Sequence, residues 1–422
     1  MTRKPSTMNQ GSDASASPEH QFWSTQPVVK GSEMTTPEGP LENRTVADVR
    51  QDPFPIASVL EWWVPDIMGT EDDLTQVYEL LRDNYVEDDE SMFRFNYSRE
   101  FLKWALAPPG YIQNWHVGVR RKSDKKLVAF ISGIPVDVQV KRASEPRDDE
   151  TTPVGEVEHR KMCEINFLCI HKMLREKRLA PILIKEVTRR VNVLDMWQAV
   201  YTAGIKLPTP FASAQYFHRS LNPEKLVAIR FSRIPAQYEK FQNPMQMMKR
   251  TYAVAKSSVK GIRPMEAADV PAVCSMLRAT LSRFHVAPVF SEDEVRHWFI
   301  PQEGVVYSYV VEDPKTKTVT DFVSFYSLPS TIIGHTRYTD LNAAYSYYYS
   351  ANTISINALM NEALTFAKEK DFDVFNTLDI LDNGKFLSDL KFGPGDGNLH
   401  YYFFNWGYPT IQPPQVGLVM LQ

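Results

Sequence analysis

The sequence predicts a mixed α/β protein built from two similar lobes, each a mixed sheet flanked by helices. Predicted strands and helices alternate along the chain, which is typical of α/β folds. The succession of helix, hairpin, strand, helix and strand occurs in nearly the same form in each half, which indicates an internal duplication. With 422 residues, the chain is long enough for two hydrophobic cores.

The first copy starts with an amphipathic helix, because its apolar residues recur at helical spacing on one face. That face carries Leu74, Val77, Tyr78 and Leu81. The expected elements are a helix over 72–83, a hairpin over 115–120 and 127–136, a strand over 165–170, a helix over 179–191 and a strand over 197–203.

The second copy starts near Asp269, an N-cap candidate that precedes Pro271. Its first helix should bury Val270, Val273, Cys274, Leu277 and Leu281. The expected elements that follow are a hairpin over 305–311 and 319–328, a helix over 356–368 and a strand over 372–376.

Composition points to a protein that works in solution in the cytoplasm. Hydrophobic residues make up 43% and charged residues 23%, the values of a globular protein. A net charge of −4 gives no nucleic-acid signature. The three cysteines form no CxxC pair, which fits a reducing compartment. The sequence has no apolar run of membrane-spanning length and no signal-peptide core, and no Cys/His cluster that would hold a metal.

The first 45 residues are polar, and we expect most of this tail to be disordered. The segment 20–28 interrupts it with the adjacent aromatics Phe22 and Trp23. This segment is expected to dock, either on the protein's own core or against a ligand. Residues 141–159 mix charges and proline and are expected to form a surface loop.

The stretch from Glu164 to Val191 combines an apolar strand, a basic turn and the start of a helix. Pro181 fits a first helical turn. The free N–H groups at a helix start, together with the helix dipole, favour bound phosphate. The pattern therefore predicts a site for the pyrophosphate of an acyl-CoA, and a merely solvated turn is the alternative.

Within that turn, Arg175-x-x-Arg178-x-Ala180 resembles the Gln/Arg-x-x-Gly-x-Gly/Ala loop of the acyl-CoA N-acyltransferase (GNAT-like) superfamily. The chain departs from the loop at Arg178, where the superfamily has glycine. We expect Arg178 to supply its backbone donor at a negative φ.

Longer motifs resemble the glycylpeptide N-tetradecanoyltransferase (N-myristoyltransferase) family. Glu164 to Pro181 is similar to its first signature, and Lys391-Phe-Gly-Pro-Gly-Asp-Gly-Asn-Leu399 to its second. Shorter matches are Phe22 to Val28, Tyr201 to Gly204, His218 to Pro223 and Phe325 to Ser330. The resemblance covers residues 22–422, and several loops are most similar to the kinetoplastid members.

The resemblance implies two pseudo-symmetric GNAT-like lobes. Residues 46–210 would bind myristoyl-CoA, and residues 211–422 would bind a peptide and end at the active site. The implied reaction moves myristate from myristoyl-CoA, a substrate rather than a resident cofactor, to the α-amine of an N-terminal glycine exposed by Met removal. We expect a monomer, with no nucleic-acid partner.

The resemblance also assigns catalytic roles. The backbone amides of Phe167 and Leu168 would form the hole for the oxyanion of the tetrahedral intermediate, and Asn166 and Thr202 would hold the glycine amine. The base would be the C-terminal carboxylate of Gln422. This assignment agrees with the residues themselves, because 416–422 are almost wholly apolar, and burial of a carboxyl raises its pKa and makes it a better base.

Binding residues follow from the same match. Those for myristoyl-CoA are His20, Phe22, Trp23, Phe167, Leu168, Arg175, Lys177, Arg178, Leu179, Ala180 and Pro181. Those for the peptide are Phe95, Tyr97, Tyr216, His218, Tyr326, Ser330, Tyr345, Gly395, Asp396 and Gly397. Taken singly, each of these aromatics is more often a core residue than a groove residue.

Three alternatives remain. Cys169 could carry the acyl group, but a thiol on an apolar strand is normally buried and inert, so we expect direct attack of the amine. A GNAT-type acetyltransferase acting on lysine or a small amine would share the CoA loop but would need no long apolar channel. An inactive acyl-CoA or peptide-binding module is the third alternative.

Overall fold

The computed structural model describes residues 22–30, 38–88, 91–143 and 158–421. Its helices are α2 (Glu71–Asn84), α3 (Arg99–Leu106), α4 (Leu179–Asn192), α5 (Pro223–Ala228), α6 (Ala236–Glu239), α7 (Pro244–Thr251), α8 (Val270–Leu281), α9 (Glu292–Phe299) and α10 (Ile356–Glu369). Its strands are β1 (Leu60–Trp63), β2 (Phe93–Phe95), β3 (Val117–Arg121), β4 (Leu127–Val140), β5 (Glu158–Ile170), β6 (Ala199–Ala203), β7 (Ala212–Ser220), β8 (Ile262–Pro264), β9 (Val286–Pro288), β10 (Val306–Glu312), β11 (Val319–Ser327), β12 (Ser330–Ile332), β13 (Asp340–Leu341), β14 (Ala343–Ser350), β15 (Val374–Leu378) and β16 (Gly393–Phe404).

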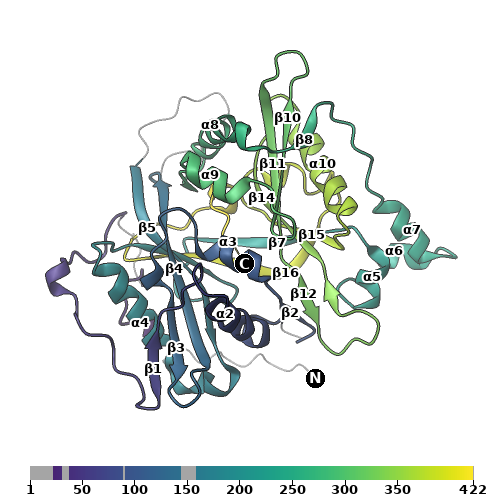
Figure 1. Cartoon of the computed structure of the whole chain (residues 1–422). Helices are drawn as coiled ribbons and strands as arrows, with labels where there is room; N and C mark the ends of the chain where they lie inside the picture. Colours follow the sequence, from purple (N-terminus) through teal and green to yellow (C-terminus); the bar gives the residue numbers. More distant parts are fainter. Residues whose placement is uncertain (1–21, 31–37, 89–90, 144–157, 422) are drawn as a thin grey trace, which may run out of the picture.

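One long mixed sheet runs through both halves of the molecule, in the order β1-β3-β4-β5-β6-β16-β7-β15-β14-β11-β10-β8 (Figure 1). In the first half, β3, β4 and β5 are antiparallel neighbours, and α4 crosses to β6, which is parallel to β5. In the second half, β10, β11 and β14 repeat this arrangement, and α10 crosses to the parallel strand β15. The predicted duplication is confirmed.

The two lobes exchange their last strands at the centre of the sheet. Strand β7 follows β6 in the chain but pairs with β15 of the second lobe. Strand β16 follows β15 but pairs with β6 of the first lobe. The two exchanged strands also pair with each other. The halves are therefore joined by backbone hydrogen bonds as well as by side-chain packing.

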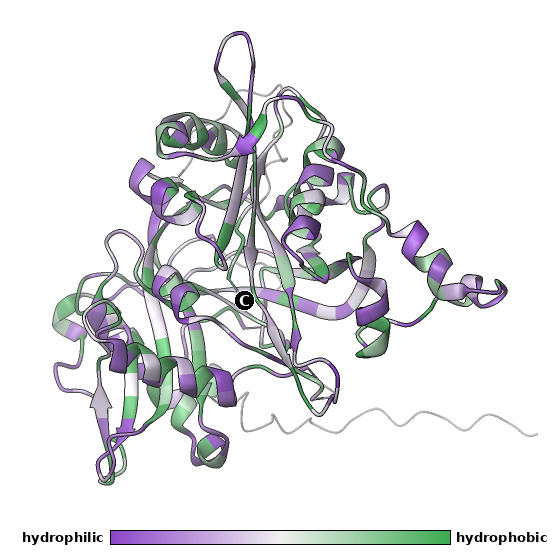
Figure 2. Ribbon diagram, turned by 45° about the vertical axis from the view of Figure 1, so that its right-hand side comes forward, coloured by the Kyte–Doolittle hydropathy of each residue, from purple (hydrophilic) through white to green (hydrophobic). Residues whose placement is uncertain are grey.

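Most helix residues that the sequence predicts to be buried are buried in the structure. On α8, all five predicted residues are buried, and on α2, Leu74, Val77 and Leu81 are buried while Tyr78 is partly exposed. Figure 2 shows both green and purple residues on most helices, as expected of helices that bury one face. No helix in the described ranges has the length and apolar character needed to cross a membrane.

Two sequence expectations need correction. Asp269 does not cap α8 with its side chain; its carboxylate instead accepts hydrogen bonds from Arg263, at 2.7 and 2.9 Å, because an arginine fork binds a carboxylate more strongly than a helix amide does. The second copy also contains a strand that the sequence did not reveal, β14. Every residue of β14 is buried, so it lacks the alternating pattern by which a half-buried strand is recognised.

Candidate active site

Residues predicted to act together lie on one face of the central sheet. Glu164 pairs with Val200, so Asn166 and Thr202, two residues further along β5 and β6, lie on the same face. Thr202 pairs with Tyr401, and the register continues across the sheet to the peptide-side residues. That face includes Tyr216 and His218 of β7, Asn376 of β15, Tyr345 of β14 and Tyr326 of β11.

Phe167 and Leu168 form a β-bulge directly after Asn166. Phe130 pairs with Cys169 and Ser132 with Asn166, so Phe167 and Leu168 together face only one residue of β4. Phe167 has a φ of 54°, a backbone conformation that is rare away from glycine. A bulge takes backbone groups out of the regular ladder. The Phe167 N–H donates to Oδ1 of Asn166 in this structure, so a ligand oxygen bound at the bulge would have to replace that hydrogen bond.

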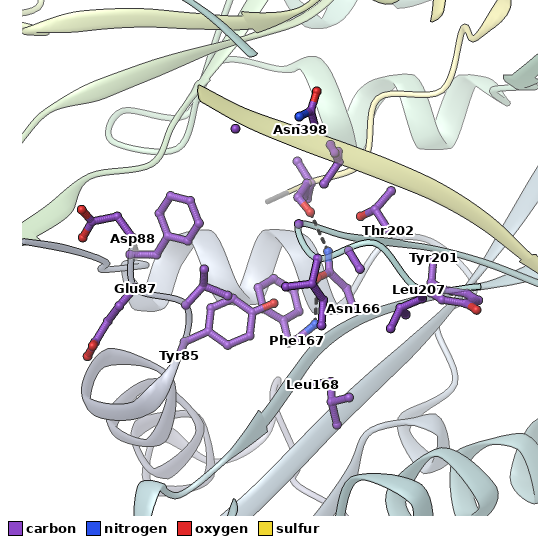
Figure 3. A pocket seen from close by; sticks show the side chains of 18 of the residues that line it. Tyr85, Glu87, Asp88, Asn166, Phe167, Leu168, Tyr201, Thr202, Leu207 and Asn398 are labelled. Atoms are coloured by element: carbon purple, nitrogen blue, oxygen red, sulfur yellow. Dashed lines mark hydrogen bonds between the residues drawn. The ribbon is translucent and has the colours of Figure 1, made fainter. Parts of the chain in front are cut away.

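The side chain of Asn166 connects this bulge to the end of the chain. Its Oδ1 accepts a hydrogen bond from the Phe167 N–H at 2.7 Å, and its Nδ2 donates to the Leu421 carbonyl at 2.8 Å (Figure 3). The preceding residues Val416, Leu418 and Met420 are buried, as the apolar sequence predicts. Gln422, the predicted base, lies outside the described residues.

A cavity of about 2430 Å³ opens in front of this face, which is larger than an ordinary ligand pocket. Asn166, Phe167, Leu168, Thr202 and Leu421 all line it. The cavity reaches α4 on one side, and α5 and β12 on the other. It is large enough for more than one substrate at a time.

On the α4 side, the predicted phosphate loop is a 3-10 helix, Lys172–Lys177, followed by Arg178. The expectation of a negative φ at Arg178 is wrong, because its φ is 54°. This residue ends one helix and begins the next, a position where the chain must turn through the left-handed region. Helix α4 has no side-chain cap, so its first N–H groups remain available to an anion.

The predicted CoA-side residues divide into two groups. Arg175, Arg178, Ala180 and Pro181 line the cavity, whereas Lys177 and Leu179 do not. The guanidinium of Arg175 also donates to the carbonyls of Ile170 and Asn84, so part of its hydrogen-bonding capacity fixes the loop to the end of α2. Lys177 is exposed and Leu179 is buried in the core.

The aromatic segment near the N-terminus docks on the protein and also faces the cavity. Trp23 stacks on Tyr201 with ring centroids 5.7 Å apart. The Pro27 carbonyl accepts from the Asn405 N–H. Phe22 and Trp23 also line the cavity, so the segment docks on the protein itself, and its contact with a ligand stays a prediction. His20 lies outside the described residues.

On the peptide side, the cavity is lined by most of the predicted residues: Phe95, Tyr216, His218, Ser330, Tyr345, Gly395, Asp396 and Gly397. Tyr97 and Tyr326 do not line it, and each is only 1% exposed. Tyr97 lies instead among aromatic rings that include Phe167, at 5.2 Å. These two tyrosines therefore support the walls of the cavity.

His218 is held as a neutral ring. Burial lowers its pKa, while its hydrogen bond to Asn376 and the charge of Asp396 oppose that shift. The Nδ1 of His218 is 2.7 Å from Oδ1 of Asn376, which makes Nδ1 the donor in this bond. Asp396 is exposed at the cavity. This wall can therefore offer both a neutral ring and a negative charge to a peptide.

The thiol alternative loses support from the geometry. Cys169 is buried, and burial raises the pKa of its thiol to about 12. A nucleophilic cysteine needs a lowered pKa. Its Sγ is 3.8 Å from the Leu80 carbonyl. Cys169 is therefore a core residue at neutral pH.

Several cavity residues were not predicted. Tyr85, Glu87, Asp88 and Phe93 come from the end of α2 and the segment after it, and Arg230 and Phe231 from the segment after α5. Their ring contacts join segments far apart in sequence, such as Phe93 with Phe231 at 5.8 Å. The tripeptide Phe93-Arg-Phe95 was the one available signal, since Phe95 was predicted from the resemblance.

Comparison with known proteins supplies the family. The N-terminal domain model of myristoyl-CoA:protein N-myristoyltransferase matches residues 40–214, and the C-terminal domain model matches residues 228–419. Glycylpeptide N-tetradecanoyltransferase 1 of Arabidopsis thaliana is 52% identical over 408 residues, which are 95% of this chain and 89% of the relative. The Dictyostelium discoideum enzyme is 48% identical over 403 residues, with 95% and 92% covered.

A solved structure agrees over the whole fold. The crystal structure of Saccharomyces cerevisiae N-myristoyltransferase with bound myristoyl-CoA has a TM-score of 0.87 and 40% sequence identity, and the match covers 96% of this chain and 100% of that one. These relatives do not test the likeness to kinetoplastid members, which stays a prediction. The repeated fold, the bulge beside a long cavity and the two matched domain models together show that the chain belongs to the N-myristoyltransferase family.

Proposed function

We propose that this protein transfers myristate from myristoyl-CoA to the α-amine of an N-terminal glycine, with the carboxylate of Gln422 as the base. The names of its relatives and the myristoyl-CoA in the yeast structure support the two substrates. The observation that carries the mechanism is the Asn166 side chain, which joins the bulge to the carbonyl of Leu421. Gln422 directly follows Leu421 in the chain, and consecutive Cα atoms are about 3.8 Å apart. The proposed base is therefore one residue away from this hydrogen bond.

In this proposal the incoming amine attacks the thioester directly. The base accepts an ammonium proton, and the neutral nitrogen adds to the carbonyl carbon. The amides of Phe167 and Leu168 stabilise the resulting oxyanion, and Thr202, with Asn166, orients the amine. Fixed donors of this kind contribute about 3–4 kcal/mol each to lowering the barrier. The tetrahedral intermediate then expels the CoA thiolate, which takes up the second proton of the attacking nitrogen, and leaves the amide.

The two halves would divide the substrates. The loop before α4 and the segment 22–25 would hold myristoyl-CoA, and the wall formed by Tyr216, His218, Tyr345 and Asp396 would hold the peptide. Each CH₂ of the acyl chain gains about 0.8 kcal/mol on burial. We further propose that the protein works as a monomer in the cytoplasm, on glycine N-termini exposed after Met removal.

Changing the chain end tests the base. Adding a few residues after Gln422, or deleting the last few, should slow transfer about 100-fold or more, because the carboxylate would be displaced. Both variants should keep their affinity for myristoyl-CoA, measured by calorimetry, because that site lies toward α4. Full turnover by either variant would remove the terminal carboxylate from the mechanism.

The acetyltransferase alternative is tested separately by comparing acetyl-CoA with myristoyl-CoA as donors to one glycine peptide. The long cavity predicts a strong preference for the myristoyl donor, measured as kcat/KM. Equal rates, or a preference for a lysine acceptor, would favour the alternative.

A further inference from the structure

One branch of the cavity runs between α4 and the sheet of the first lobe, and apolar side chains line it. These side chains are Ile131, Ile165, Ile184, Val187, Val191 and Phe404. All of them belong to, or pack against, one hydrophobic cluster of the first lobe. The branch therefore extends into a hydrophobic core, and it suits the acyl chain of a donor better than its phosphates or a peptide backbone.

The branch narrows along β5 as it leaves the bulge at Phe167. Side chains two residues apart on a strand share a face, so Ile165 and Cys163 follow one another on the face that α4 covers. Leu168 is 37% exposed, Ile165 is partly exposed and Cys163 is 0% exposed. Cys163 nevertheless lines the cavity, whereas Lys161, the next residue on this face, does not. Cys163 therefore lies at the closed end of the branch.

A row of residues crosses the sheet at this closed end. Ala199 of β6 pairs both with Cys163 of β5 and with Phe404 of β16, and residues paired in this way have neighbouring side chains on one face. All three line the cavity, and none is more than 9% exposed. Val191 of α4 lines the cavity in the same cluster. The row thus forms a floor across the end of the branch.

Gly133 of β4 leaves the space in which the Cys163 thiol lies. It pairs with Ile165, so a side chain at position 133 would lie on the same face. A Cβ there would be 2.7 Å from Sγ of Cys163, which is too close for two unbonded atoms. Gly133 has no positive φ, so this position needs glycine for space and not for its backbone conformation. A side chain would push the thiol away from β4, toward the channel.

We propose that the Cys163 thiol, together with Ala199 and Phe404, ends the acyl channel and so sets the longest acyl chain that the enzyme accepts. Gly133 is a positioning residue, because it keeps the thiol back from the channel. The inference rests on the proposed function, which places the thioester carbonyl at the bulge. A chain too long for the channel would withdraw its carbonyl from the bulge, because a close-packed floor yields little. A shorter chain would lose about fourfold in affinity for each missing CH₂.

Cys163→Ala tests the floor, because removing the thiol lengthens the channel. We expect the ratio of kcat/KM for palmitoyl-CoA to kcat/KM for myristoyl-CoA to rise about tenfold or more, since a fitted methylene in an apolar pocket changes this ratio about 10- to 200-fold. Calorimetric Kd values for the two donors should shift in the same direction without any turnover. A ratio measured on one preparation is unaffected by the fraction of protein that is folded.

Gly133→Ala should have the opposite effect, because it pushes the thiol into the channel. We expect the ratio of kcat/KM for lauroyl-CoA to that for myristoyl-CoA to rise about tenfold. In the double variant with Cys163→Ala, the displaced thiol is absent, so this ratio should return to within about twofold of wild type. Ala199→Val adds volume to the same floor and should act like Gly133→Ala, which keeps this arm available if the glycine variant does not fold.

The matched control is Cys274→Ala, which removes a buried thiol of α8 that does not line the cavity. It should keep both ratios at wild-type values. Wild-type ratios in Cys163→Ala and Ala199→Val, or an equal shift in the control, would overturn the proposed floor. A double variant that stays as selective for lauroyl-CoA as Gly133→Ala would overturn the role of Gly133. Failure of the proposed function would show differently, as no transfer from any of the donors to a glycine peptide by the wild-type protein.

Discussion

Asn166 is the residue on which the proposed geometry depends most directly. Its amide has two partners, the Phe167 N–H and the Leu421 carbonyl. We predict that Asn166→Ala lowers kcat by about 10- to 100-fold, because both the oxyanion donor and the chain end lose a fixed position. Steady-state kinetics with a glycine peptide would measure this. The control is Asn357→Ala on α10, which removes one hydrogen bond to Asp389 and should leave kcat unchanged.

Gly395 is required because of its distance to His218. A Cβ at position 395 would lie 2.3 Å from the Nε2 of His218, which forces the ring to move. We predict that Gly395→Ala raises the KM for peptide about tenfold and leaves the Kd for myristoyl-CoA unchanged. Gly393→Ala is a sharp control, since a Cβ there meets nothing within 4 Å. Equal KM values for the two variants would show that the position of His218 is unimportant.

His116, just before β3, is hydrogen-bonded to the end of α3. This contact makes the stability of the fold depend on pH. His116 is fully buried, its Nε2 bonds the Leu106 carbonyl at 2.8 Å, and burial lowers its pKa to about 4. Below about pH 6.5 the unfolded chain binds a proton that the folded chain does not. We predict that His116 makes the free energy of unfolding fall as pH drops from 6.5 toward 4, by up to about 3 kcal/mol.

Denaturant titrations at several pH values would measure this contribution. The variant His116→Gln should be less stable than wild type at pH 7 but should lose less stability on acidification, because it cannot be protonated. A variant as acid-sensitive as wild type would assign the pH dependence to other groups.

Helix α4 begins at a strained residue, and the strain has a measurable cost. Arg178 has a φ of 54°, which costs a non-glycine residue about 1 kcal/mol. We predict that Arg178→Gly increases the free energy of unfolding by about that amount while weakening myristoyl-CoA binding, because a cation at the proposed phosphate site is lost. Asp371→Gly, at a φ of 60° after α10, should raise stability without changing the Kd. Calorimetry and thermal unfolding would separate the two effects.

At the scale of the whole molecule, the exchange of β7 and β16 makes the lobes interdependent. A protein comprising residues 46–210 would lack β16, which pairs with β6 along its whole length, and would expose an unpaired edge. We predict that neither 46–210 nor 211–422 folds alone, and that the two regain activity when they are co-expressed. Circular dichroism and limited proteolysis of each part would test this. A compact, protease-resistant 46–210 would show that the first lobe is an independent domain.

Several features could be predicted from the sequence alone. The repeated order of elements and the buried faces of α2 and α8 follow from the spacing of apolar residues. That spacing involves residues only three or four positions apart, so it can be recognised in the sequence without knowledge of the tertiary structure. The motif around Asn166, Phe167 and Leu168 also identified the strand that lines the cavity, because these residues are consecutive in the chain.

Contacts between residues that are distant in the sequence became known only from the tertiary structure. The bulge and the positive φ of Phe167 arise from the register between β4 and β5, which no local pattern encodes. The exchange of β7 and β16 pairs Tyr401 with Thr202, residues that lie almost 200 positions apart in the chain. Contacts at that separation depend on the packing of the complete sheet, so the cavity and the position of Leu421 beside Asn166 are decided only when both lobes are assembled.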